Sequence, residues 1–116
     1  IMASVFKNAG ITVPVVDTSA GNLFTAGASA TAVIHALYIS NKSTSASATV
    51  NVKVTTDGGS TFYHIGKSLE VPPNNTLTLD KPVNLEANDI VRVVADANPD
   101  SSSVDVEAYA SILELT

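Results

Sequence analysis

Apolar and polar residues alternate along much of the chain, and the pattern is clearest between residues 48 and 71. Valine occupies every second position from Val50 to Val54, with polar residues between. This period of two is typical of a strand with one buried and one solvent-facing side. Asp57-Gly58-Gly59 follows, and these residue types tolerate the positive φ angles that hairpin turns need. The stretch therefore predicts a β-hairpin whose valine face joins the core.

The same pattern predicts further strands on both sides of the hairpin. They are separated by clusters of Gly, Pro, Asn, Asp and Ser, which form turns. The predicted strands cover residues 4–16, 32–41, 76–80, 83–85, 90–97 and 104–115. No segment has a capped helical period, so we expect an all-β fold. The most suitable architecture is a single antiparallel β-sandwich, jelly-roll or Ig-like, of about 7–8 strands.

Two of these strands have apolar residues on both faces. Residues 32–41 predict a central strand, with Ile34 and Tyr38 expected on the same face. In the last strand, Leu113 and Leu115 fall out of step with the apolar positions before them. This change predicts either a bulge or a strand end that is buried on its other side.

The chain, residues 1–116, fits one domain, in which residues 1–31 form an N-terminal arm and loop. Pro14 cannot donate to a strand ladder, so the first segment is either an edge strand or an arm that packs on a neighbouring subunit. Residues 17–31 are rich in small side chains and predict a loop. Because the hairpin is polar and plain on its outer side, we expect partner contacts in this N-terminal region. The candidate contact residues are Val5, Phe6, Val13, Leu23 and Phe24.

Leu23 and Phe24 are apolar residues in an otherwise polar loop. They either close the core from outside or form an exposed contact point for a partner.

Composition narrows the classes of partner. The 116 residues are 45% hydrophobic and 15% charged. A chain of this length and hydrophobic content can form a core without disulfides or metals. The net charge of −5 and the scattered six basic residues argue against nucleic-acid binding. The absence of cysteine excludes a disulfide scaffold and thiolate chemistry. No apolar run approaches the roughly 18 residues of a membrane span, so we expect no membrane partner.

The sequence contains no recognisable catalytic motif. His35 and His64 lie in predicted strands without the base or orienting group that catalysis requires. Carboxylates gather late in the chain. They are either solvated strand ends, a calcium site built from two of them (Asp96 and Asp100), or a catalytic pair. We expect no enzyme, no cofactor and no metal. The late acidic residues are Asp96, Asp100, Asp105 and Glu107.

Sugar-binding sandwiches usually present exposed aromatic side chains, and aromatic residues make up only 5% of this chain. Phe62, Tyr63 and Tyr109 form at most a modest platform.

Several sequence blocks follow one another in an order that resembles a known family. These blocks are residues 37–41, 49–54, 69–72, 77–82 and 85–93. Together they resemble small β-sandwich virion-associated structural proteins of tailed bacteriophages, especially those of marine phages, over residues 33–116. In that family a glycine precedes the aspartate that is Asp89 here. The present chain has Ala87-Asn88 instead, so we expect a local difference in that turn.

The resemblance implies a non-enzymatic part of a virion, assembled in the cytoplasm of the bacterial host. The role it favours is a capsid decoration (cement) protein that docks on the major capsid protein as a homo-oligomer, with a trimer favoured. A tail, neck or fibre accessory protein is the alternative within the virion. A carbohydrate-binding β-sandwich module is the alternative from a different class.

Overall fold

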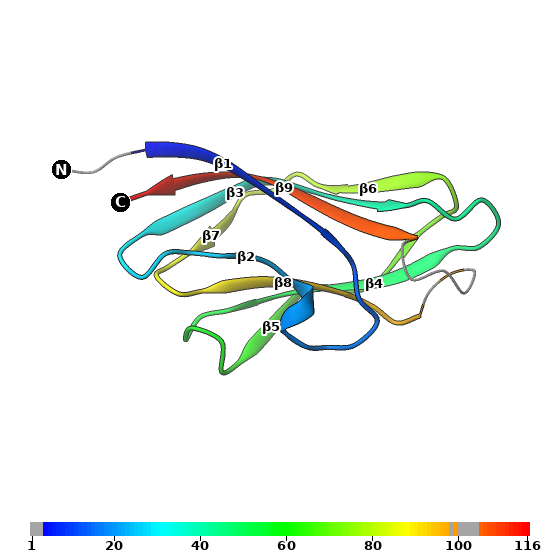
Figure 1. Cartoon of the computed structure of the whole chain (residues 1–116), viewed down its shortest axis with the longest axis horizontal. Helices are drawn as coiled ribbons and strands as arrows, with labels where there is room; N and C mark the ends of the chain where they lie inside the picture. The colour runs from blue at the N-terminus through cyan, green and yellow to red at the C-terminus, as the bar shows by residue number, and fades with distance from the viewer. Residues whose placement is uncertain (1–3, 98, 100–104) are drawn as a thin grey trace.

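The computed structural model describes residues 4–97, 99 and 105–116, and these fold into two antiparallel sheets packed face to face (Figure 1). The first sheet contains, in spatial order, β1 (Ser4–Thr12), β9 (Val106–Leu115), β3 (Thr31–Asn41) and β6 (Asn75–Leu79), with β7 (Val83–Leu85) also paired to β3. The second sheet contains β2 (Asn22–Thr25), β8 (Ile90–Ala95), β4 (Ala48–Thr55) and β5 (Phe62–Val71). The predicted antiparallel β-sandwich is confirmed, with nine strands in the described residues.

The core lies between the two sheets and is built from the inward side of each alternating strand. From the second sheet, Val50, Val52, Val91 and Val93 are completely buried. Each such side chain contributes about 1.5–3 kcal/mol to stability through burial. The valine face of the hairpin is therefore part of the core, as predicted. The first sheet opposes it with Ile34, Leu37, Ile39, Val106, Ala108, Ala110 and Ile112.

The N-terminal segment forms an edge strand and then crosses to the other sheet. β1 pairs with β9 along its whole length. After the crossing, a short 3-10 turn (η1, Ser19–Gly21) leads into β2. The prediction of a loop is therefore wrong for residues 22–25. Leu23 is only 5% exposed and Phe24 packs against the core, so burial of these two side chains draws the segment onto the edge of the second sheet.

β3 is a central strand, as predicted, but its two faces differ from the prediction. The pairing of β3 with β9 shifts register between Ile34 and Ala36. An extra residue in a strand reverses the alternation beyond it. Ile34 is therefore buried in the core, whereas Tyr38 is 38% exposed on the outer side.

The irregularity expected near Leu113 lies in β3 instead, because the register of β9 with β1 is unbroken. Leu113 and Leu115 are half-buried on the outer side of β9, which corresponds to the second of the two predicted alternatives. The inward row of β9 continues to Glu114, which is 6% exposed. The predicted turn at residues 98–103 and the strand start at Val104 lie outside the described residues, Pro99 excepted.

Glu114 is an acidic residue at the end of an inward row. Its carboxylate pairs with the Lys7 ammonium of β1 and accepts a hydrogen bond from the Gly27 amide at 3.1 Å. The Lys7 contact, followed by the Gly27 bond, holds the pKa of Glu114 below its ordinary value. These contacts tie the start of β1 and the segment after β2 to the end of β9.

Two turns at one end of the second sheet use left-handed backbone. Gly58 and Gly59 in the β4–β5 turn have φ angles of 77° and 119°, as predicted. In the β7–β8 turn, Asn88 has φ 67°. Asparagine tolerates this conformation better than most residues, so it takes over the function of a glycine there. The Asp89 carboxylate accepts hydrogen bonds from the amides of Glu86 at 3.0 Å and Gly58 at 3.4 Å, which links the two turns.

Candidate functional site

The outer face of the first sheet carries exposed aromatic side chains and few charges. Strand pairing arranges its side chains in rows that run across the sheet. Two of these rows are Phe6, Leu113, Val33 and Asn84, and Gly10, Tyr109, Tyr38 and Thr78. Phe6 is 81% exposed, and Tyr38 and Tyr109 are 38% and 44% exposed. We call this surface the aromatic face. Exposed aromatic and apolar side chains gathered on one surface are typical of interaction sites.

A groove of about 420 Å³ lies beside the tyrosines on the aromatic face. The ring centroids of Tyr38 and Tyr109 are 6.2 Å apart and tilted by 44°, a usual geometry for an aromatic pair. Gly10 lines the groove and has no side chain, so the backbone of β1 is accessible beside the Tyr109 ring. Thr12 and Glu107 line the adjoining end. The groove thus combines an aromatic wall with polar groups.

This arrangement corrects the predicted aromatic platform. Tyr109 belongs to the first sheet, whereas Phe62 and Tyr63 belong to the second. The ring that accompanies Tyr109 is that of Tyr38. The sequence did not reveal this pair because it depends on the β3–β9 register and on the bulge that turns Tyr38 outward.

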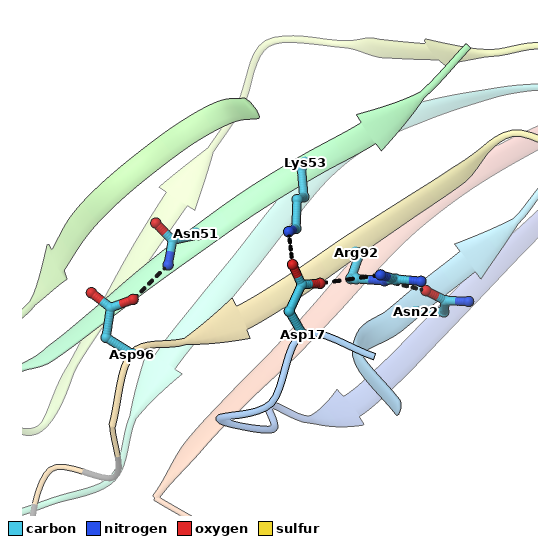
Figure 2. Close-up of polar contacts among 6 residues, drawn as sticks. All are labelled: Asp17, Asn22, Asn51, Lys53, Arg92 and Asp96. Atoms are coloured by element: carbon cyan, nitrogen blue, oxygen red, sulfur yellow. Dashed lines mark hydrogen bonds and ion pairs between the residues drawn. The ribbon is translucent and has the colours of Figure 1, made fainter. Parts of the chain in front are cut away.

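The outer face of the second sheet carries a polar cluster (Figure 2). Asp17, from the segment between β1 and β2, forms ion pairs with Lys53 of β4 and Arg92 of β8. The Arg92 guanidinium also donates to the Asn22 side chain at 2.8 Å. The guanidinium carbon lies 4.2 Å from the centroid of the Phe62 ring.

The hairpin pattern indicated a plain polar surface at this position, but the cluster differs from that description. The Lys53 and Arg92 side chains are only 11% and 14% exposed, because Asp17 and its segment lie over them. The Lys53 hydrogen bond is the main reason that the pKa of Asp17 lies below its ordinary value. The two cations share the single carboxylate of Asp17, so the cluster holds the N-terminal crossing segment on the sheet.

A second polar pair lies beside it on the same face (Figure 2). The Asn51 amide donates to Asp96 at 2.8 Å, and its carbonyl oxygen accepts from the Ser68 amide at 2.9 Å. Ser68 has φ 54°, and the β4–β5 register is shifted around it. Asn51 therefore supports a bulge in β5, which is a structural role.

The predicted contact residues fall into two groups. Val13 and Leu23 are 1% and 5% exposed, and Phe24 is half-buried against the core, so the folded chain uses them for packing. Val5 and Phe6 are 45% and 81% exposed on the edge strand. Their role in binding a partner stays a prediction, and their side chains are the exposed ones among the five candidates.

The late acidic residues do not form one site in the described part of the chain. Glu107 pairs with Lys42 at 3.3 Å on the first sheet, whereas Asp96 bonds Asn51 on the second. Asp105 is buried, and Asp100 lies outside the described residues. Among the described residues, no group of three or more acidic or histidine side chains is placed to hold a metal ion.

The two histidines lie on different sheets, so they cannot act together. His35 is exposed in β3 with its ring centroid 6.5 Å from that of Phe6, and His64 is exposed in β5. None of the described helical structure has the length and hydropathy to span a membrane.

Neither a scan against protein-family models nor a search of curated proteins finds a match. Solved structures do resemble the fold. A chain of the acidic stable capsid of Helicobacter pylori bacteriophage KHP30 aligns with a TM-score of 0.51 at 14% identity, over 100% of this chain and 94% of that chain. A chain of infectious bursal disease virus, Gx strain, aligns with a TM-score of 0.50 at 7% identity, over 99% and 32%. At these identities the similarity establishes a β-sandwich fold that viral and phage capsid structures also contain.

A further solved structure aligns with a lower score. The CBM22-1 xylan-binding domain of Paenibacillus barcinonensis Xyn10C aligns with a TM-score of 0.45 at 10% identity, over 76% of this chain and 55% of that domain. We draw no functional conclusion from a similarity at this level.

Proposed function

We propose that this chain is a non-enzymatic structural protein of a virion, and more specifically a capsid decoration protein that docks on the major capsid protein. The observation that carries the proposal is the aromatic face, where Phe6 is 81% exposed on the edge strand of a sheet with few charges. A fold shared with a phage capsid chain over the full length of this chain supports it.

The physical basis is burial of surface, not chemistry. Asp17, Lys53 and Arg92 pair with one another on the second sheet, while the aromatic face offers exposed apolar area. A partner that buries the Phe6 end of this face gains binding free energy from that burial. A small domain that repeats on a lattice, or assembles as a homo-oligomer with a trimer favoured, multiplies weak contacts into firm attachment. Phe6 on this face, and Val5 on the opposite side of the same edge strand, are the residues we propose at the contact.

The test is to measure the mass of the purified chain in solution and its co-sedimentation with tailed-phage heads built from the candidate major capsid protein. We expect an oligomer that sediments with heads. Phe6→Ser should weaken this association at least about tenfold, since a buried aromatic anchor contributes more than 1.4 kcal/mol.

Tyr63→Ser is the matched control, because Tyr63 is 56% exposed but belongs to the second sheet. Its association with heads should be unchanged. A monomer that never sediments with heads would contradict the proposal. Labelling of particles in negative stain at the tail, neck or fibre would instead support the alternative virion role.

A further inference from the structure

The groove beside Tyr109 has features that a protein contact through Phe6 does not use. Gly10 lies four residues further along β1 than Phe6, which is about 13 Å at the rise of a strand. The groove volume of about 420 Å³ is within the range of small-ligand sites. A ligand there and a protein partner at Phe6 could therefore be bound at separate ends of the aromatic face.

The wall of the groove suits the apolar side of a flat ring. Tyr38 and Tyr109 are both partly exposed, and their rings are tilted rather than stacked on each other. Opposite Tyr109 in the strand pairing is Gly10. A Cβ atom at Gly10 would meet only the Ala108 carbonyl at 3.6 Å and the Tyr109 ring at 3.9 Å, so the position is open.

The next row across the sheet adds hydrogen-bond donors and acceptors. It consists of Thr12, Glu107, Ser40 and Thr76. The hydroxyl oxygens of Ser40 and Thr76 are 2.9 Å apart and bonded to each other. Glu107 pairs with Lys42, and both side chains are about half-exposed, at 50% and 48%. This row offers hydrogen-bond donors and acceptors, and the ion pair with Lys42 balances the charge of Glu107.

We propose that the groove between Tyr109 and Gly10 binds a neutral saccharide. A sugar ring lies with its C–H face against the Tyr109 ring, and its hydroxyls bond the polar row through Thr12 and Glu107. Aromatic side chains supply apolar area with a polar edge, which fits a ligand that has both. The site is open to solvent, so the dissociation constant is on the order of 0.1–1 mM.

The other ligand classes fit this groove less well. An anion such as phosphate needs unpaired cations, whereas no cationic side chain among the described residues lines the groove and Lys42 is paired with the groove-lining Glu107. A purely apolar ligand would displace water from Thr12 and from the half-exposed Glu107 carboxylate without replacing its hydrogen bonds. A metal ion needs several carboxylate or carbonyl oxygens converging, whereas the carboxylate that lines this groove is Glu107.

The experiment is a titration with soluble neutral oligosaccharides, namely cellohexaose, xylohexaose, mannohexaose and chitohexaose, each up to 10 mM. The chain has no Trp and three Tyr, and two of the tyrosines line the groove. Tyrosine fluorescence therefore reports directly on binding. Amide NMR shifts locate it, and the changes should centre on Gly10 and Ser40.

Three variants test the site. Tyr109→Ala should weaken binding at least about tenfold, since it removes the ring that stacks on the sugar. Gly10→Val fills the groove and keeps both rings, so it should abolish binding without unfolding the edge strand. Tyr63→Ala removes the third tyrosine, which is exposed on the second sheet, and should leave binding unchanged.

The proposal is overturned if none of the four oligosaccharides gives a saturable change, or if Tyr109→Ala and Gly10→Val bind as the original chain does. Tighter binding of a sulfated glycan than of its neutral counterpart would also overturn it. None of these results bears on sedimentation with heads, so the saccharide site and the virion role fail or succeed independently.

Discussion

The carboxylate of Asp17 reaches the ammonium group of Lys53 across the outer face of the second sheet and covers a cation that is only 11% exposed (Figure 2). Burying most of a charged side chain costs free energy that an oppositely charged partner offsets. The residue that provides this partner lies 36 positions earlier in the chain. The contact therefore fastens the segment between β1 and β2 onto the sheet.

Removing this carboxylate should destabilise the fold. Asp17→Ala leaves both Lys53 and Arg92 without their shared anion. Because Asp17 itself is half-exposed, we expect a loss of about 1–2 kcal/mol, below that of a fully buried pair. Urea unfolding at neutral pH, followed by circular dichroism, measures the change.

A double-mutant cycle separates the ion pair from other effects of the substitution. In a Lys53→Met background, Asp17→Ala should be less destabilising by at least about 0.5 kcal/mol. An equal loss in both backgrounds would mean that Asp17 stabilises the segment in another way.

The ion pair of Glu114 with Lys7 should make stability depend on acid pH. The pKa of Glu114 is lowered in the folded chain from an ordinary value of 4.5, first by Lys7 and then by the Gly27 amide. The ionised carboxylate of Glu114 therefore stabilises the folded chain. This stabilisation is fully present at pH values above 4.5 and is lost as the pH falls through the lowered pKa of the folded chain.

Glu114→Gln tests this dependence. At neutral pH the variant should be about 1–2 kcal/mol less stable, since Lys7 is half-exposed and the pair is only partly screened. The difference from the original chain should shrink as the pH falls below 4.5. A difference that stayed constant down to the lowest pH would show that the charge of Glu114 is not its cause.

Asn88 should tolerate glycine better than any β-branched residue. Its φ of 67° lies in the left-handed region. Asn88→Gly relieves the strain but adds freedom to the unfolded chain, so we expect a change between zero and about 1 kcal/mol of added stability. Asn88→Val should lower stability by about 1–2 kcal/mol. Thermal unfolding of the two variants gives the comparison, and equal stabilities would contradict the strained backbone.

Gly21 and Gly10 provide a matched pair of glycines. A Cβ atom at Gly21 would lie 2.7 Å from the Val93 carbonyl oxygen, which belongs to the backbone of β8 and cannot move aside cheaply. Gly21→Ala should therefore cost about 1–3 kcal/mol. Gly10→Ala meets only ordinary contacts and should be neutral or slightly stabilising. Similar melting temperatures for both variants would argue against the close approach at Gly21.

The sequence predicted the fold well wherever apolar and polar residues alternated within a single strand. The valines of β4 and β8 occupy the inward positions that the pattern indicated. The pattern could not predict the short strand β2, because Leu23 and Phe24 offer only two apolar residues among small and polar ones. It also could not locate the bulge in β3, since an extra residue is visible only in the pairing with β9.

The candidate sites were harder to predict because they depend on residues far apart in sequence. Lys53 occupies a polar position of an alternating strand, and nothing in the hairpin indicates that Asp17 covers it. Tyr38 and Tyr109 meet through a strand register that a single sequence does not specify. Val5 and Phe6 were chosen because Pro14 marks the first segment as an edge strand or arm, and their role in binding a partner stays a prediction.

The pairing of β1 with β9 sets the order in which the molecule can form (Figure 1). The β4–β5 hairpin is local and can fold as soon as it is synthesised, whereas β1 has no strand of its own chain to pair with until β9 has left the ribosome. Throughout that interval the backbone of β1 is open to the β9 strand of another copy. Because β9 follows the other described strands, the first sheet is completed after the second, and that is the step at which neighbouring copies can exchange strands.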